Sequence, residues 1–167
     1  VLGEEPIKVA FNVTSTPVDA RKAAVYRLNG QSYEYVGGVY DKSKKQFVVS
    51  LHTFGTFALL EQSKTFNDVT SRSAWAKDEI EVLASRSIIQ GMTKDHFEPN
   101  KPITRAQFAV LLARALQLPT GVYKGVFTDV SSQMAWAAPY IEAAYRAGIV
   151  QGNKGFFKPN DFITREQ

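Results

Sequence analysis

Two arginines occupy the same place in a short motif that occurs twice in the chain. Residues 104–107 read Thr-Arg-Ala-Gln, and residues 164–167 read Thr-Arg-Glu-Gln. Threonine followed three residues later by glutamine predicts a capping box at a helix start, with the arginine in the first helical position. The helix dipole disfavours a cation there by roughly a few tenths of a kcal/mol. Because a cation beside free backbone N–H groups suits a carboxylate or phosphate, Arg105 and Arg165 are predicted to bind an anion; a surface or intramolecular salt bridge is the alternative.

Two tryptophans also recur, each in an Ala-Trp-Ala segment before the arginine motif. An aromatic side chain near the start of an amphipathic helix most often belongs to the core. An indole face can also cover the apolar side of a pyranose ring. Trp75 and Trp136 are therefore predicted to lie in the core, or at its edge where they could serve both roles. Asp68 and Asp129, which precede the same helices, are predicted to be turn or capping groups and not catalytic groups.

Two Gln-Gly pairs recur in the same way. Gln90-Gly91 follows the first predicted helix of one copy, and Gln151-Gly152 follows that of the other. We expect both glycines to adopt an unusual backbone angle and to let a ligand approach the chain closely.

The elements that would position these residues recur about 61 residues apart, as a repeated supersecondary module would. Helical periodicity predicts a first helix with Trp75 on its apolar face, a second helix over 105–118, and a further helix over 138–147. The apolar stripe of the second helix is predicted to consist of Phe108, Leu111, Leu112, Ala115 and Leu116.

Residues 1–62 read differently, as short runs rich in Val, Tyr, Phe and Ile that are separated by turn signals. The runs cover 6–13, 22–28, 32–40, 46–52 and 57–61, and Gly37-Gly38 interrupts the third as a bulge or bend would. We expect α+β by segregated domains, with an antiparallel sheet or sandwich fragment followed by helix-loop-helix repeats. The expected parts are a β-rich module at 1–62, a complete repeat at 63–124 and a truncated repeat at 125–167.

Composition excludes several kinds of partner. The chain has no cysteine, so disulfides and thiolate metal sites are excluded, and we expect neither a metal nor a cofactor. The net charge of +4 is spread out, without a block of Lys or Arg dense enough to track nucleic acid. No apolar run reaches the roughly 18 residues of a spanning helix.

The repeated pattern resembles the S-layer homology domain. It consists of Phe-x-Asp-Val, Trp-Ala, Gln-Gly after an Ile or Val, Phe-x-Pro-Asn, and Ile-Thr-Arg-x-Gln. The resemblance covers about 66–118 fully and 127–167 as a truncated copy. The final Gln107 and Gln167 replace the glutamate of the family signature, which keeps the cap but removes a negative charge.

The resemblance implies non-catalytic anchoring of exported proteins to the cell wall or S-layer surface of Gram-positive bacteria. In the family, grooves between three modules bind secondary cell-wall polysaccharide, often through pyruvylated N-acetylmannosamine. By this analogy Arg105 and Arg165 would hold the ketal carboxylate. The other groove candidates would be Trp75, Trp136, Gln90, Gly91, Gln151 and Gly152. Because fewer than two modules are present, homo-oligomerisation or exchange between chains is a further expectation.

Other functions stay open beside anchoring to polysaccharide. The modules could mediate S-layer self-assembly, bind peptidoglycan directly, or belong to a fragment of an exported glycan-degrading enzyme. The only imidazoles, His52 and His96, lie in no recognisable nucleophile, zinc or phosphate-loop motif. We therefore predict no catalytic residue in this chain.

Overall fold

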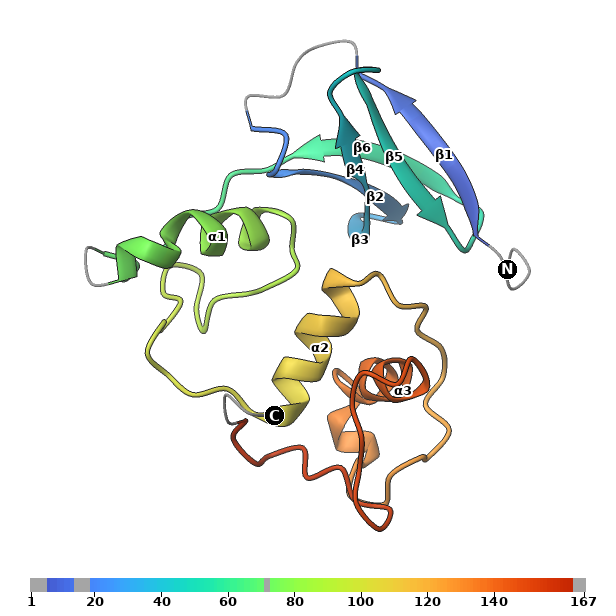
Figure 1. The fold of residues 1–167 in the computed structure, drawn as a ribbon, viewed down its shortest axis with the longest axis vertical. Coiled ribbons are helices and arrows are strands. Elements are labelled where there is room, and N and C mark those ends of the chain that lie inside the picture. The colour runs from blue at the N-terminus through green and yellow to red at the C-terminus, as the bar shows by residue number, and fades with distance from the viewer. Residues whose placement is uncertain (1–5, 14–18, 71–72, 164–167) are drawn as a thin grey trace. The chain divides into compact units, whose positions relative to one another are not determined.

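The structure, a computed structural model, describes residues 6–13, 19–70 and 73–163 (Figure 1). It divides into two compact units, 1–99 and 100–167, which we call the first and second units and describe separately. Antiparallel strands fill the N-terminal part of the chain and helices follow them, so the predicted fold class is confirmed. The predicted module boundaries at 62 and 124 stay a prediction about the sequence repeat.

The first unit holds two three-stranded antiparallel sheets, with strand orders β1-β5-β4 and β3-β2-β6. All six strands lie within one residue of a predicted run, except that the run at 32–40 forms two strands. Their bounds are β1 Ile7–Asn12, β2 Ala23–Asn29, β3 Ser32–Gly37, β4 Val39–Asp41, β5 Gln46–Leu51 and β6 Thr56–Glu61.

Alternation along β5 builds the core between the two sheets. Phe47, Val49 and Leu51 are buried, while the residues between them are half-buried. These three side chains pack with Ala23 and Val25 of β2, which belongs to the other sheet. The pleat thus brings one face of each sheet into a shared apolar layer.

Gly37 and Gly38 explain why one predicted run became two strands. Their φ angles are 115° and 109°, values that favour glycine. β3 pairs with β2, whereas β4 pairs with β5 of the other sheet. The glycine pair therefore lets the chain pass from one sheet to the other.

Helix α1 (Ala74–Ser85) belongs to the first unit and is bonded to the strands. The Tyr26 hydroxyl donates to the backbone oxygen of Ser85 at 3.2 Å, and Arg86 Nη2 donates to the backbone oxygen of Gly38 at 2.8 Å. Ile80 and Ala84 form the buried side of the helix. The first helix of the repeat is thus part of one folded body with the β-rich segment.

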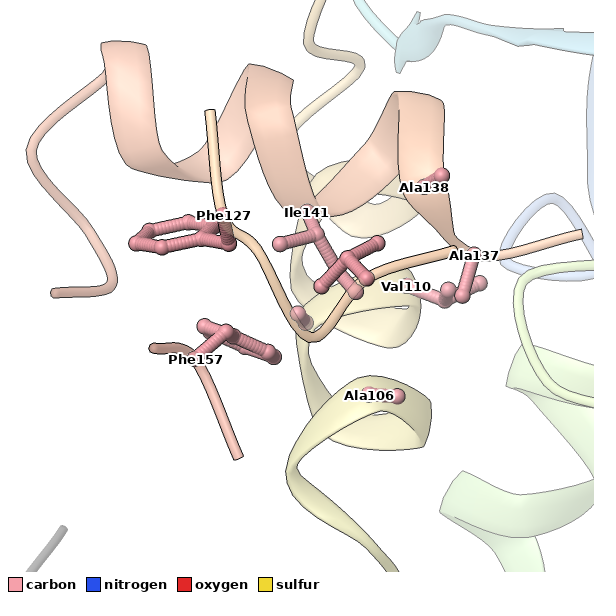
Figure 2. Packing of buried hydrophobic residues seen from close by; sticks show 9 residues of the cluster. Ala106, Val110, Phe127, Ala137, Ala138, Ile141 and Phe157 are labelled. Atoms are coloured by element: carbon pink, nitrogen blue, oxygen red, sulfur yellow. The ribbon is translucent and has the colours of Figure 1, made fainter. Parts of the chain in front are cut away.

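The second unit contains helix α2 (Arg105–Ala115), the 3₁₀ turn η2 (Ser132–Met134) and helix α3 (Ala138–Arg146). Figure 2 shows that α2 and α3 meet through small side chains, with Phe127 and Phe157 beside them. The buried cluster consists of Ala106, Ala109, Val110, Phe127, Val130, Ala137, Ala138, Ile141 and Phe157.

The predicted apolar stripe of α2 is wrong. Ala115 and Leu116 are exposed, and Phe108 and Leu112 are only half-buried. The buried residues of this helix are Ala106, Ala109, Val110 and Ala113. This pattern is the predicted one shifted by two residues, so the buried face lies about 160° around the helix axis from the predicted face, since each residue turns the helix by about 100°. Alanine lets the backbones of two helices approach closely, so the smallest side chains mark the packed side.

Glu142 links α3 to the segment before it. Its Oε2 accepts a hydrogen bond from Lys124 N at 2.7 Å, and its Oε1 accepts from Arg146 Nε at 2.8 Å. The residue is only 5% exposed. The bond from Lys124 N, with the pairing to Arg146, lowers the pKa of the Glu142 carboxyl below its usual range.

We predict that Glu142→Gln removes part of the acid sensitivity of the second unit. A lowered folded-state pKa means that the carboxylate stabilises the fold above its unfolded pKa, about 4.3, and loses this effect as pH falls through the folded value. At pH 7 the variant should be less stable by about 1 kcal/mol, and the difference should shrink toward pH 3. Urea unfolding at several pH values measures it, with exposed Glu79→Gln as the control. A difference that stays constant with pH would contradict the assignment.

Candidate functional site

The start of α2 is capped as the sequence predicts. Thr104 Oγ1 accepts from Gln107 N at 3.3 Å, and Gln107 Oε1 accepts from Thr104 N at 2.9 Å. This reciprocal pair confirms the capping box and places Arg105 at the first helical position. The equivalent motif at 164–167, including Arg165, lies outside the described residues.

The first backbone N–H groups of this helix are not free, contrary to expectation. Arg105 N donates to the backbone oxygen of Asp161 at 2.8 Å, and Ala106 N donates to that of Pro159 at 3.0 Å. The loop of the second repeat supplies carbonyl groups where an anion was expected. An anion site here must therefore depend on the arginine side chain.

The guanidinium of Arg105 is positioned by the same loop. Its Nε donates to the backbone oxygen of Phe157 at 3.0 Å, and its Nη2 donates to that of Gln151 at 3.0 Å. The guanidinium carbon lies 4.9 Å from the centre of the Phe157 ring. Carbonyl dipoles and the ring face offset the unfavourable helix dipole. Sequence reasoning missed these contacts, because they join residues about fifty positions apart.

One edge of the guanidinium remains available. Among the described residues, no hydrogen-bond partner is found for Arg105 Nη1, and no carboxylate lies within 4.0 Å of the side chain. Arg105 borders a groove of about 350 Å³, which we call the second groove. Its walls are Arg105, Phe108, Leu112, Gly148, Ile149, Val150, Gln151, Phe157 and Ile163. The arrangement offers a fixed cation, amide groups and apolar walls.

The first unit holds a groove of about 390 Å³, which we call the first groove. Its walls are Gln62, Ser63, Lys64, Phe66, Ala84, Ser87, Ile89, Gln90, Gly91 and Thr93. The predicted site residues are therefore divided. Gln90 and Gly91 line the first groove, and Arg105 and Gln151 line the second. Neither tryptophan lines either groove, and Gly152 does not line the second.

The prediction that the tryptophans lie in the core is wrong. Trp75 is 85% exposed and Trp136 is 51% exposed. Along α1, Trp75 lies about 140° around the axis from the buried Ile80, so the two cannot share a face. The role of Trp75 and Trp136 in ligand binding stays a prediction.

Gly91 and Gly152 are needed for a reason other than backbone angle. Neither is among the described glycines with positive φ. A Cβ on Gly152 would lie 2.2 Å from a ring carbon of Phe127, and one on Gly91 would lie 2.5 Å from a ring carbon of Phe66. These glycines therefore allow an aromatic ring of their own repeat to approach the backbone closely.

Asp68 and Asp129 hold the loops that border the grooves. Asp129 accepts from the backbone N–H groups of Phe157 and Lys158 at 2.8 and 2.7 Å. Asp68 accepts equivalent bonds from Phe97 and Glu98 in the first repeat, and the bond from Phe97 N lowers the pKa of the Asp68 carboxyl. Both carboxylates therefore hold a loop about thirty residues along the chain, which is a structural role but differs from the predicted local turn or helix cap.

Two kinds of site are absent from residues 6–13, 19–70 and 73–163. In this part of the chain no group of three or more His, Asp or Glu could hold a metal ion. None of its helices has the length and apolar character needed to cross a membrane.

Several known proteins are similar in sequence to this chain over more than half of its length. An amylopullulanase of Thermoanaerobacterium thermosulfurigenes is 45% identical over 165 residues, which are 98% of this chain and 9% of that protein. Endo-1,4-beta-xylanase A of Thermoanaerobacterium saccharolyticum is 49% identical over 108 residues, which are 65% of this chain and 9% of that protein. The S-layer protein sap of Bacillus anthracis is 39% identical over 103 residues, which are 61% of this chain and 12% of that protein. The chain thus spans about a tenth of the length of these relatives.

The sequence profile of the S-layer homology domain matches residues 65–109 and 126–167. Together the two matches cover more than half of the chain and coincide with the two copies of the repeat. With the S-layer relatives, they confirm the predicted location at the cell wall or S-layer surface and support an anchoring module without catalytic groups of its own. The chain therefore belongs to the S-layer homology domain family.

Proposed function

We propose that this chain anchors a larger protein to the cell wall by binding an acidic secondary cell-wall polysaccharide. The Arg105 guanidinium would hold a carboxylate of the glycan, such as a pyruvate ketal, in the second groove. Arg165, in the equivalent motif of the second repeat, would do the same. The single observation that carries this proposal is that Arg105 lines a groove without a carboxylate partner among the described residues.

The chemistry of the second groove suits such a ligand. Two carbonyl groups and the Phe157 ring fix the guanidinium plane, so little side-chain entropy is lost when an anion binds. The Gln151 amide can bond sugar hydroxyl groups, and Phe108 and Leu112 offer apolar surface to a pyranose ring. A charged hydrogen bond in a partly buried groove contributes more than a neutral one.

The relatives support a role that does not depend on one enzymatic substrate. By their names, they include an amylopullulanase, a xylanase and S-layer proteins, whose common segment cannot serve a single catalytic reaction. Attachment to the cell surface is a role that all of them could share.

A titration of purified wall polysaccharide, with and without its pyruvate, against wild type and Arg105→Gln tests the proposal. We expect the substitution to weaken binding of the pyruvylated glycan by at least about tenfold, because a charged donor is lost. Removing pyruvate should weaken wild-type binding to a similar extent, and the two losses should not add. Arg114→Gln, which removes the same charge elsewhere on α2, should bind like wild type. Equal binding in all four combinations would refute the mechanism.

S-layer assembly or direct peptidoglycan binding is the second candidate, favoured by the S-layer relatives and by a cell wall amidase of Bacillus anthracis that is 33% identical over 108 residues. Retention on peptidoglycan from which the polysaccharide has been stripped would support this candidate. Association or exchange between copies of the chain stays a prediction.

A further inference from the structure

The sheet of β3, β2 and β6 is buried on both of its faces. Ala23 and Val25 of β2 point into the core between the two sheets. Ala24 and Tyr26 alternate with them and therefore point the opposite way, yet both are fully buried as well. Tyr35 is the cross-strand partner of Tyr26, and we call the side that carries Ala24, Tyr26 and Tyr35 the outer face of the sheet. This face needs a partner in addition to the other sheet.

Helix α1 and the residue after it supply this partner. The Tyr26 hydroxyl donates to the backbone oxygen of Ser85, the last residue of α1. The guanidinium carbon of Arg86 lies 5.7 Å from the centre of the Tyr35 ring. Arg86 Nη2 donates to the backbone oxygen of Gly38, where the chain passes between the sheets. The end of α1 is therefore fixed to the outer face at three points.

Arg86 is an uncommon group for such a contact, because it is a cation that is shielded from water. Among the described residues, its Nε is buried without a hydrogen-bond partner, and no carboxylate lies within 4.0 Å of the guanidinium. A buried donor without a partner lowers stability. Such a group can be retained because it selects one arrangement of two packed surfaces over others.

The second repeat lacks the groups that hold α1 on the sheet. Besides Ser85 and Arg86, α1 contributes Asp78, which accepts from Arg21 Nη1 at 2.5 Å. The positions 61 residues later carry Pro139, Arg146 and Ala147 in place of Asp78, Ser85 and Arg86. Proline and alanine could not make these side-chain bonds, and an arginine would not fit in place of the fully buried Ser85. Although both helices follow one repeat, α1 is suited to the outer face and α3 is not.

We propose that the two sheets form an adaptor for the first repeat. The outer face is the docking surface, α1 is its dedicated partner, and Arg86 fixes their orientation. The strands and α1 then form one rigid joint instead of two modules on a flexible linker. A larger protein attached through this adaptor would be held at a set angle to its anchor. This role involves no contact with a glycan, so it stands or falls separately from the proposed function.

Residual dipolar couplings of backbone amides in the weakly aligned, isotope-labelled intact chain test the joint. In the wild type, couplings from β1–β6 and from α1 should fit a single alignment tensor. Arg86→Ala installs the residue of the second repeat, and the couplings of α1 should then require a tensor of their own. Hydrogen exchange measures the size of the effect. The opening constant of α1 amides relative to those of β5 should rise by at least about tenfold, because a charged hydrogen bond is lost.

Lys77→Ala is the matched control. It also removes a cation from α1 and installs the second-repeat residue, Ala138, but Lys77 is paired with Glu81 of the same helix, so the single tensor should be kept. If α1 alone loses its helical chemical shifts in Arg86→Ala, the docking is supported too, since an isolated helix of 12 residues is marginal in water.

A milder variant decides the case in which Arg86→Ala unfolds the strands as well. Tyr26→Phe removes one hydroxyl group and should raise the same exchange ratio by about threefold. An unchanged ratio in that variant would overturn the proposal. So would two tensors in the wild type, or a single tensor with unchanged exchange in Arg86→Ala.

Discussion

Replacing Gly152 by alanine is expected to lower the free energy of unfolding of the second unit by about 3 kcal/mol. The added Cβ would lie 2.2 Å from a Phe127 ring carbon and 2.7 Å from the backbone oxygen of Phe156. The backbone oxygen cannot move without moving the loop, and the Phe127 ring is packed between Phe157 and Tyr145. Overpacking of a core without space to relax typically costs about 1–3 kcal/mol, and this site is at the upper end.

Urea unfolding measures this effect if the signal comes from the second unit alone. The chain has two tryptophans, one in each unit, so a Trp75→Phe background leaves Trp136 as the only indole reporter. Gly121→Ala is the matched control, because a Cβ there meets nothing within 4 Å and should change stability by less than about 0.5 kcal/mol. Equal stability of Gly152→Ala and Gly121→Ala would contradict the packing argument.

Replacing Phe157 by alanine is expected to cost still more, about 3–5 kcal/mol. Phe157 is 1% exposed and lies in the cluster between α2 and α3 (Figure 2). The centre of its ring lies 5.4 Å from the centre of the Phe127 ring and 4.9 Å from the guanidinium carbon of Arg105. Truncation would leave a cavity and remove one support of the candidate anion site. Since whole domains are stable by about 5–15 kcal/mol, the second unit could lose most of its stability.

The adjacent phenylalanine provides the control for this experiment. Phe156 is 50% exposed, so Phe156→Ala removes the same side chain from the same loop with little loss of packing. Its effect should stay below about 1 kcal/mol. The Trp136 signal in urea measures both variants, and the same protein can then be titrated with the glycan. Similar destabilisation by the two substitutions would show that the buried Phe157 side chain stabilises the second unit no more than the exposed Phe156 side chain does.

The strands and the capping box were accessible from sequence because they depend on near neighbours. The alternation of Phe47, Val49 and Leu51 needs only the pleat, and the bond between Thr104 and Gln107 spans one helical turn. The interruption predicted at Gly37-Gly38 is confirmed, because β3 ends and β4 begins there. The chain passes into a second sheet at this point because β3 pairs with β2 and β4 pairs with β5. This strand pairing cannot be inferred from the local sequence.

The helix faces were less predictable, since side-chain size misled the assignment. Phe108 and Leu112 are larger than Ala109 and Ala113, yet the alanines are the buried residues of α2. Large side chains contribute most to burial on average, but close contact between helices selects small ones. The exposure of Trp75 has the same origin, because its place on the helix matters more than its hydrophobicity.

The sequence by itself determined the repeat, the order of strands and helices, the cap before Arg105 and the family, because each depends on residue type at short spacing. Only the tertiary structure decided that carbonyl groups of the second repeat occupy the helix start and orient the Arg105 guanidinium. It also decided that α1 folds with the strands in the first unit, while α2 folds with α3 in the second. These outcomes depend on contacts between distant segments, and their energies come from burial and hydrogen bonding that no local pattern records.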